Sequence, residues 1–259
     1  MNPDITPFPV LQFTDTPVDP KQYIEKGTGA AKAFGYVFAL IGLVILAAST
    51  FGLGLLAVPL GLAVDYFNRK KAMARLKGSA LEVGPDQLPE LHQCARSFAT
   101  RLGMKEVPAI YVVESNVINA VAMRIGSRQV IILIDDVVDS CLRSGDRRAI
   151  GFVLAHEMAH HALGHTGIVQ GFLFQTFKKL SRLNEFTCDA VARALVHEES
   201  VAVNALLVLL TGPQLVPYVN RAALLRQAAE VAADKNSAKS ESTLSHPLML
   251  RRLQRMLTQ

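Results

Sequence analysis

The chain has 259 residues, of which 50% are hydrophobic and 19% charged, and its mean hydropathy of +0.26 points to a membrane segment. The formal net charge is +5, but five basic residues lie between Arg69 and Lys77 with no acidic one among them, so the rest of the chain is balanced. This placement favours a patch that flanks a membrane and excludes a nucleic-acid surface. Three scattered cysteines exclude a disulfide framework and suit a reducing compartment.

The N-terminal part of the chain divides into a proline-rich stretch and a long uncharged one. Residues 1–31 hold five prolines among mixed charges and predict an extended tail. Residues 33–64 carry no charge and would form a helix of about 48 Å, against a hydrocarbon core of about 30 Å. We therefore expect a transmembrane segment over 32–67, as a hairpin that turns at 49–52 rather than as one tilted span. A buried hairpin in the core of a soluble protein is the alternative.

The charges around the uncharged run predict its orientation. Lysines precede the run, and the denser basic group at 69–77 follows it. Basic residues favour the cytoplasmic side, so a hairpin would leave both the tail and residues 68–259 in the cytoplasm.

The next segment predicts a helix and a small sheet. Apolar residues at helical spacing predict a helix over 86–103 that ends at a glycine. Short β-branched runs predict strands at 110–113, 119–123 and 130–134. The acidic pair at 135–136 is expected in a loop. A small sheet of this kind offers an edge to which an extended peptide can add as a strand.

The sequence LAHEMAHHALGH at 154–165 contains an H-E-x-x-H motif within good helix formers, with Asp146 as the expected N-cap. Residues four apart share a helix face, so His156 and His160 can aim both imidazoles at one ion at roughly 2.0–2.1 Å. Glu157 lies beside the ion, where its carboxylate can take a proton from a metal-bound water. The alternative is a helix with two ordinary histidines and a solvated glutamate.

A second helical stretch carries Glu185 and Asp189, again four residues apart. A catalytic zinc site uses three protein ligands and one open position, and Glu185 would be the third ligand. Asp189 would accept the free ring N–H of a ligand histidine and fix its tautomer. We therefore expect one zinc ion per chain, bound by His156, His160 and Glu185. The alternative for both acids is a solvated helix face.

The remaining segments are less specific. Residues 166–183 are partly apolar and too short to span; a position on the bilayer surface, over the metal site, or in the core is open. Residues 200–210 predict a core helix in preference to a third span. The polar residues at 228–245 predict a mobile loop that leads to His246 and to a closing helix over 247–257.

The order of these motifs resembles a known family. H-E-x-x-H at 156–160 followed by E-x-x-x-D at 185–189 is similar to the membrane zinc metallopeptidases of the HtpX and CAAX-prenyl endopeptidase family, in the gluzincin group. The resemblance covers roughly residues 85–259 and keeps the order of the family's motifs.

Two weaker stretches extend the resemblance. Asn119–Ala122 resembles the family's Asn-Ala-Phe-Ala segment, with Val121 where phenylalanine is usual, and Ser245–Pro247 resembles its C-terminal His-Pro segment. The resemblance implies that Asn119 and His246 contact the substrate or stabilise the tetrahedral oxyanion. The alternative for His246 is an exposed histidine that starts a helix.

Together these features predict an α+β chain, mostly helical with a small β-sheet: a tail at 1–31, a transmembrane segment at 32–67 and a gluzincin-like zinc metallopeptidase domain at 68–259. We expect a membrane-anchored zinc metalloendopeptidase, with Glu157 as general base, acting on a peptide or protein substrate. By resemblance it would lie in a bacterial inner membrane and serve membrane protein quality control. A non-proteolytic adaptor that keeps zinc for folding, and a zinc hydrolase of a non-peptide bond, are the rival readings.

Overall fold

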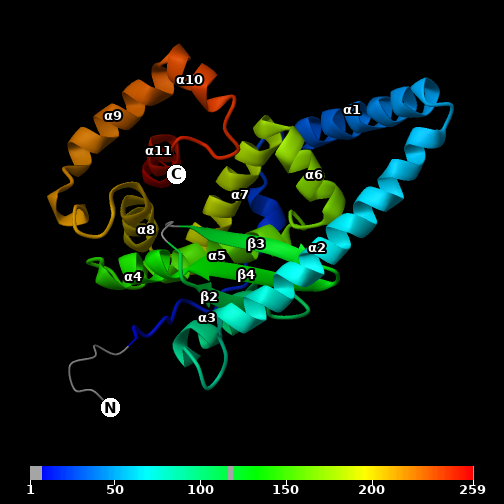
Figure 1. Cartoon of the computed structure of the whole chain (residues 1–259). Coiled ribbons are helices and arrows are strands. Elements are labelled where there is room, and N and C mark those ends of the chain that lie inside the picture. Colours follow the sequence, from blue (N-terminus) through cyan, green and yellow to red (C-terminus); the bar gives the residue numbers. More distant parts are fainter. Residues whose placement is uncertain (1–7, 116–118, 259) are drawn as a thin grey trace.

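A computed structural model describes residues 8–115 and 119–258, so residues 1–7 of the predicted tail lie outside the described part. The chain folds into a mostly helical body around a four-stranded sheet, and a long two-helix arm projects from this body (Figure 1). The prediction of a mostly helical α+β fold with a small sheet, preceded by an apolar N-terminal segment, is confirmed.

The arm consists of helix α1 (Thr28–Ser49), the 3-10 helix η2 (Leu53–Leu56) at its tip, and helix α2 (Ala57–Ser79). Within residues 8–115 and 119–258, α1 is the one helix long and apolar enough to cross a membrane. The apolar part of α2 ends at Asp65, after which charged residues follow. The chain therefore turns where a hairpin was expected, and insertion of the arm into a bilayer stays a prediction.

The tip of the arm satisfies its own backbone groups, as a turn within a lipid phase must. The Thr50 hydroxyl donates to the carbonyl of Leu46 and accepts from the amide of Gly54 at 2.8 Å. The amide of Gly52, which has a φ of 85°, donates to the carbonyl of Ala47. Phe51 at the turn is 98% exposed, so none of the described residues covers it.

The base of α1 is fixed to the body by aromatic packing. The ring of Phe177 meets the rings of Phe34 and Phe38 edge to face, with centroids 5.9 and 5.5 Å apart. Gly35 permits this approach, because a Cβ there would lie 3.2 Å from side-chain atoms of Leu173 and Phe177. This packing involves the first turns of α1 and anchors the arm at its base, whereas the rest of α1 is largely exposed.

The segment before α1 is extended and packs on the body. Phe13 stacks on Phe98 with ring centroids 5.4 Å apart, and it covers Gly151, where an added Cβ would meet the Phe13 ring at 2.6 Å. Arg101 donates to the carbonyl of Thr16 at 2.9 Å and, from its other side, to Leu195 at 2.8 Å. A short 3-10 helix, η1 (Pro20–Tyr23), then leads into α1.

The sheet contains β1 (Leu81–Glu82), β2 (Ala109–Val113), β3 (Ala120–Ile125) and β4 (Arg128–Ile134), in the order β1-β2-β4-β3. β2 and β4 are parallel, whereas β1 pairs antiparallel to β2 and β3 antiparallel to β4. Side chains alternate between faces, so one face packs on helix α5 and the other contacts α2. β3 is an edge strand, and within the described part of the chain its outer side is not paired to another strand.

Helix α5 (Ala149–Ala162) is the centre of the body and is buried over nearly its whole length. Its side chains are buried on every side, and it packs against α3, α4, α7 and α8. The surrounding helices are α3 (Pro89–Arg101), α4 (Asp135–Arg143), α6 (Ile168–Thr176), α7 (Lys178–Val196) and α8 (Glu199–Thr211). α8 is a core helix, as predicted.

Several local predictions were wrong, for identifiable reasons. The acidic pair at 135–136 opens helix α4, where Asp135 accepts the amide of Ser115 at 3.0 Å, rather than lying in a loop. Helix α5 begins at Ala149 with Arg148 before it; Asp146 binds the amide and guanidinium of Arg148 instead of capping the helix. No single element was predicted for residues 166–183, which form α6 and the start of α7 with a break at Phe177.

The predicted mobile loop at 228–245 is largely helical. Asn220 caps α9 (Arg221–Ala233) and Asp234 caps α10 (Lys235–Glu241), each through its side chain. Alanine, lysine and glutamate favour helices, so the capping residues, rather than the polarity, decide the local structure. A short 3-10 helix, η3 (Val216–Tyr218), precedes α9, and α11 (Met249–Thr258) closes the chain against α8 and α9.

Candidate metal centre

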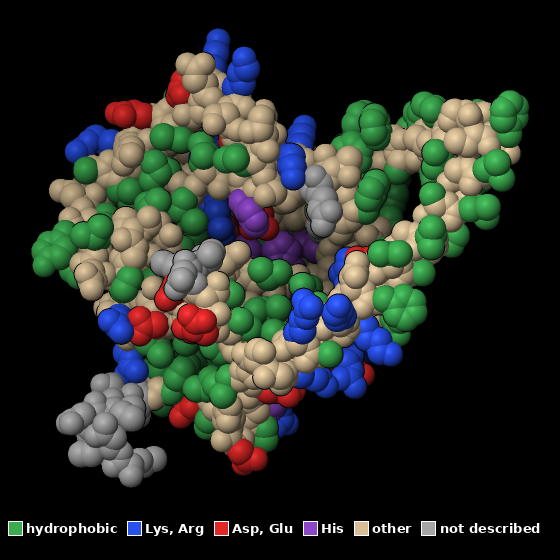
Figure 2. Space-filling view, in the orientation of Figure 1, with side chains coloured by type: hydrophobic (Ala, Val, Ile, Leu, Met, Phe, Trp, Pro, Cys, Tyr) green, Lys and Arg blue, Asp and Glu red, His purple; other side chains and the backbone are tan. Residues whose placement is uncertain are grey.

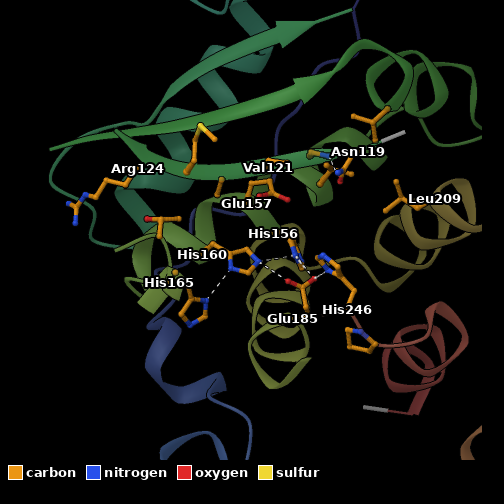
Figure 3. A pocket seen from close by; sticks show the side chains of 18 of the residues that line it. Asn119, Val121, Arg124, His156, Glu157, His160, His165, Glu185, Leu209 and His246 are labelled. Atoms are coloured by element: carbon orange, nitrogen blue, oxygen red, sulfur yellow. Dashed lines mark hydrogen bonds and ion pairs between the residues drawn. The ribbon is translucent and has the colours of Figure 1, made fainter. Parts of the chain in front are cut away.

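The two motif histidines occupy one face of helix α5 and point to the same place (Figure 3). Nε2 of His156 lies 3.3 Å from Nε2 of His160. Two ligands at 2.0–2.1 Å from a tetrahedral ion are about 3.4 Å apart, so this separation fits a shared metal ion. The helix forces the arrangement, because residues four apart project from the same face one turn from each other.

Glu185 reaches the histidines from α7, which packs along α5. Its Oε1 lies 3.3 Å from Nε2 of His160, and its Oε2 lies 3.5 Å from Nε2 of His156. These distances also fit tetrahedral ligands of one ion, so the three donors can hold zinc. Burial acts to raise the pKa of Glu185, but its bonds to the histidines hold that pKa well below its usual range, which keeps the carboxylate ionised.

The other nitrogen of His156 is held by a buried ion pair. Nδ1 of His156 donates to Oδ1 of Asp189 at 2.9 Å, and Asp189 receives two bonds from the Arg252 guanidinium at 2.6 and 2.7 Å. Burial acts to raise the pKa of Asp189, but Arg252 outweighs it and lowers that pKa. Burial likewise acts to lower the pKa of His156, but its bonds to Asp189 and Glu185 raise that pKa to about 10.

The other nitrogen of His160 faces a third histidine. Nδ1 of His160 lies 3.2 Å from Nδ1 of His165, and Sγ of Cys188 lies 3.6 Å from the same His165 nitrogen. Burial lowers the pKa of His165 to about 2, so its ring is neutral and can accept a hydrogen bond. Burial raises the pKa of Cys188, so its thiol stays protonated and is a poor metal ligand. With Nδ1–H of His160 donated to His165, Nε2 keeps its lone pair for a metal.

The remaining predicted residues lie around this triad. Glu157 is buried and lines the same cavity as the histidines. His246 comes from the segment before α11, and its Nδ1 lies 3.0 Å from Oε2 of Glu185, a bond that raises the pKa of His246. Asn119 lies at the start of β3, exposed, with its side-chain oxygen accepting the amide of Ala120 at 2.9 Å. The structure thus brings all seven predicted site residues to one region.

The site opens into a cavity of about 730 Å³. One wall is helix α5 with the histidines, and the opposite wall is strand β3 from Ala120 to Arg124 (Figure 3). At one end the cavity reaches Leu209 and Met249, and at the other it reaches Asp65 and Arg69 of α2. Figure 2 shows the hollow between the body and the arm, with histidines exposed inside it.

Two supporting residues were missed by sequence reasoning. Arg252 lies 63 residues from Asp189, and no local pattern links them. His165 is only five residues from His160, and a third histidine at the end of the motif helix was a usable signal for a supporting role. Arg252 acts through Asp189 on Nδ1 of His156, and His165 lies against Nδ1 of His160; each of these nitrogens points away from the candidate metal position.

An H-E-x-x-H helix, a glutamate from the next long helix and the open edge of a small sheet are the features of a metallopeptidase site. Residues 85–176 match Peptidase family M48, and residues 147–259 match Peptidase U49. These matches confirm the expected resemblance to this peptidase group.

Individual proteins show the same likeness. The chain is 28% identical over 202 residues to the plastoglobule-localized metallopeptidase 48, chloroplastic, of Arabidopsis thaliana, covering 66% of this chain and 57% of that protein. The chain therefore spans little more than half the length of this relative. The crystal structure of S. mikatae Ste24p is similar at a TM-score of 0.49 and 17% identity, covering 87% of this chain and 63% of that one.

Proposed function

We propose that this protein is a membrane-anchored zinc metalloendopeptidase. The observation that carries the proposal is the position of the donor triad: it lies on one wall of a cavity whose other wall is the unpaired edge of β3. His156, His160 and Glu185 would hold one zinc ion per chain. When bound, the ion would polarise the scissile carbonyl and make water a better nucleophile near neutral pH.

Glu157 supplies the base in this proposal. Its carboxylate projects into the cavity beside the ligands, one position round the helix from His156, so it can take a proton from the attacking water. The same carboxylate can then pass that proton to the leaving amine. A glutamate that serves only the structure would gain nothing from a place in the cavity beside three metal donors, and this favours hydrolysis over an adaptor role.

The edge of β3 would hold the substrate backbone. The amide of Ile134 donates to the carbonyl of Asn119, so residues 119, 121, 123 and 125 bond to β4, whereas Ala120, Ala122 and Arg124 direct their backbone groups outward. The amide of Ala120 already binds the Asn119 side chain, and the carbonyl of Arg124 accepts from Arg69 at 3.1 Å. Ala122 is therefore the main docking residue for an added strand.

His246 and Asn119 are proposed to act on the substrate. His246 lines the cavity beside Glu185, and its side chain is 67% exposed. Its ring can therefore turn from Glu185 towards a bound carbonyl oxygen. Asn119 can give up its local bond to the Ala120 amide and bind substrate at the same edge. Either donor would stabilise a developing oxyanion.

The arm is proposed to lie in the membrane as a hairpin. Both of its ends join the same body, because residues 11–25 pack on α3, α5 and α7 before α1 begins and α2 returns to the sheet. This attachment supports a tail and a zinc domain on the same side of the bilayer. The basic residues at 69–77 favour the cytoplasmic side of a bacterial inner membrane, and a role in membrane protein quality control fits that place.

The test compares purified wild-type protein with Glu157→Gln. We expect one zinc ion per chain in both by elemental analysis, and a loss of roughly 10²–10⁴-fold in cleavage of an unfolded protein by the variant, because a base is removed and no ligand is. Glu199→Gln, at an exposed position of α8, is the matched control. Wild-type protein that holds zinc but cleaves nothing would favour the adaptor, and an active Glu157→Gln would place the base elsewhere.

A further inference from the structure

One end of the cavity lies beside the point of α2 at which the uncharged run of the arm ends. Asp65 and Arg69 of α2 line the cavity together with the metal ligands. They are also the first charged residues after the uncharged run at 33–64, and Tyr66 and Phe67 between them are 49% and 66% exposed. Exposed aromatic residues at such a boundary are typical of the membrane–water interface. If the arm is inserted, this end of the cavity is at the surface of the bilayer.

At the end of the cavity that Asp65 and Arg69 line, the wall opposite α2 is helix α6. Gly167 and Gly171 line the cavity, and α6 is fixed to the base of α1 by a bond of 2.6 Å from Gln170 to the Tyr36 hydroxyl. Away from the cavity, Ile168, Val169 and Phe172 are each more than half exposed. An apolar face beside the first turns of an inserted helix would rest on the bilayer. The cavity therefore opens towards the membrane between α2 and α6.

The direction of β3 gives a direction to the substrate. β3 runs from Asn119, at the end of the cavity near Leu209, towards Arg124, whose carbonyl is bound by Arg69 of α2. An added strand is favoured in the antiparallel sense, which is the more stable pairing per residue. Such a strand has its N-terminal part at the α2 end. From Ala122 to the end of β3 at Ile125 is three residues, or about 10 Å.

We propose that the preferred substrates are polypeptides anchored in the membrane on the N-terminal side of the scissile bond and cut close to the bilayer. The proposal rests on the peptidase function above and on insertion of the arm. Such a substrate is an unfolded chain that leaves the bilayer after a membrane segment. It enters the cavity between α2 and α6 and adds to β3 in the antiparallel sense. A chain anchored at its C-terminal end would have to enter the cavity in the reverse direction.

The test uses full-length protein reconstituted into vesicles of phosphatidylethanolamine and phosphatidylglycerol. One unfolded segment of reduced and alkylated protein is presented free, joined to a transmembrane helix through its N-terminus, or joined through its C-terminus. We expect the N-terminally anchored substrate to be cut at least about tenfold faster than the C-terminally anchored one, because only it combines attachment with the favoured direction. Mass spectrometry should place the cuts within roughly ten residues of the membrane segment.

The α6 face gives a second measurement. The double variant Val169→Glu and Phe172→Glu should lower the ratio of anchored to free cleavage at least about fivefold, since charge disfavours contact with the bilayer. Leu215→Glu, at an equally exposed apolar position on the body, is the control and should keep the ratio. Equal rates for the two anchored substrates, or a preference for the C-terminal anchor, would overturn the proposal while leaving the peptidase intact. Failure to cut even the free segment would refute the peptidase function itself.

Discussion

Replacing Asp189 by alanine should reduce both the stability of the protein and its zinc affinity, for separate reasons. Asp189 is 1% exposed and bonds to His156 on one side and to Arg252 on the other. Removing it leaves the buried Arg252 charge unpaired, which costs about 3–5 kcal/mol of folding free energy. It also frees the His156 ring, which should weaken zinc binding by about 10–100-fold.

A second variant separates the two effects. In Asp189→Ala with Arg252→Met the guanidinium that Asp189 had neutralised is removed as well, so most of the lost stability should return. The zinc affinity should stay low, because His156 still lacks its acceptor. The double-mutant cycle therefore assigns the stability loss to the ion pair and the affinity loss to the histidine.

The assay uses metal-free protein for stability, because bound zinc would itself raise it. Urea unfolding in detergent gives the free energy of unfolding, and competition with a chromophoric chelator gives the zinc affinity. Asp189→Asn keeps an acceptor for His156 but not the charge. Its free energy of unfolding and its zinc affinity should lie between those of the wild type and of Asp189→Ala. A folded Asp189→Ala protein with wild-type zinc affinity would refute the supporting role of Asp189.

Three further outcomes are expected. His165→Ala should lower zinc affinity by about tenfold, because the His160 ring loses its acceptor; an unchanged affinity in chelator competition would leave His165 as packing alone. Since the raised pKa of His156 keeps a proton on the metal-free site, that proton must leave when zinc binds, so affinity should fall about tenfold for each pH unit lowered from 8.5 to 6.5; a flat profile in calorimetric titration would contradict this. Single cysteines at Thr14 and Ser240, in a cysteine-free background, should both resist an impermeant reagent in intact cells; labelling at Ser240 would place the zinc domain outside.

The candidate metal donors could be predicted from sequence because each half of the group is local. The helical repeat places His156 and His160 on one face of α5, and it places Glu185 and Asp189 on one face of α7. Both placements hold whatever the rest of the chain does. The uncharged run and its basic flanks are local in the same sense, so the arm and its turn at 50–52 follow from composition and length. Helix α9 and helix α10 were missed although their caps, Asn220 and Asp234, were visible, because polarity was given more weight than capping.

The tertiary structure decided what distant residues do to one another. Only the packing of α11 and α7 brings Arg252 against Asp189, and only the return of α2 to the sheet puts Arg69 on the carbonyl of Arg124. The proline-rich segment illustrates the same point, since its prolines predict extension but not that Phe13 covers helix α5 at Gly151. Short-range geometry follows from the spacing of residues in the chain, whereas these contacts depend on loop closure and on burial, which no local pattern contains.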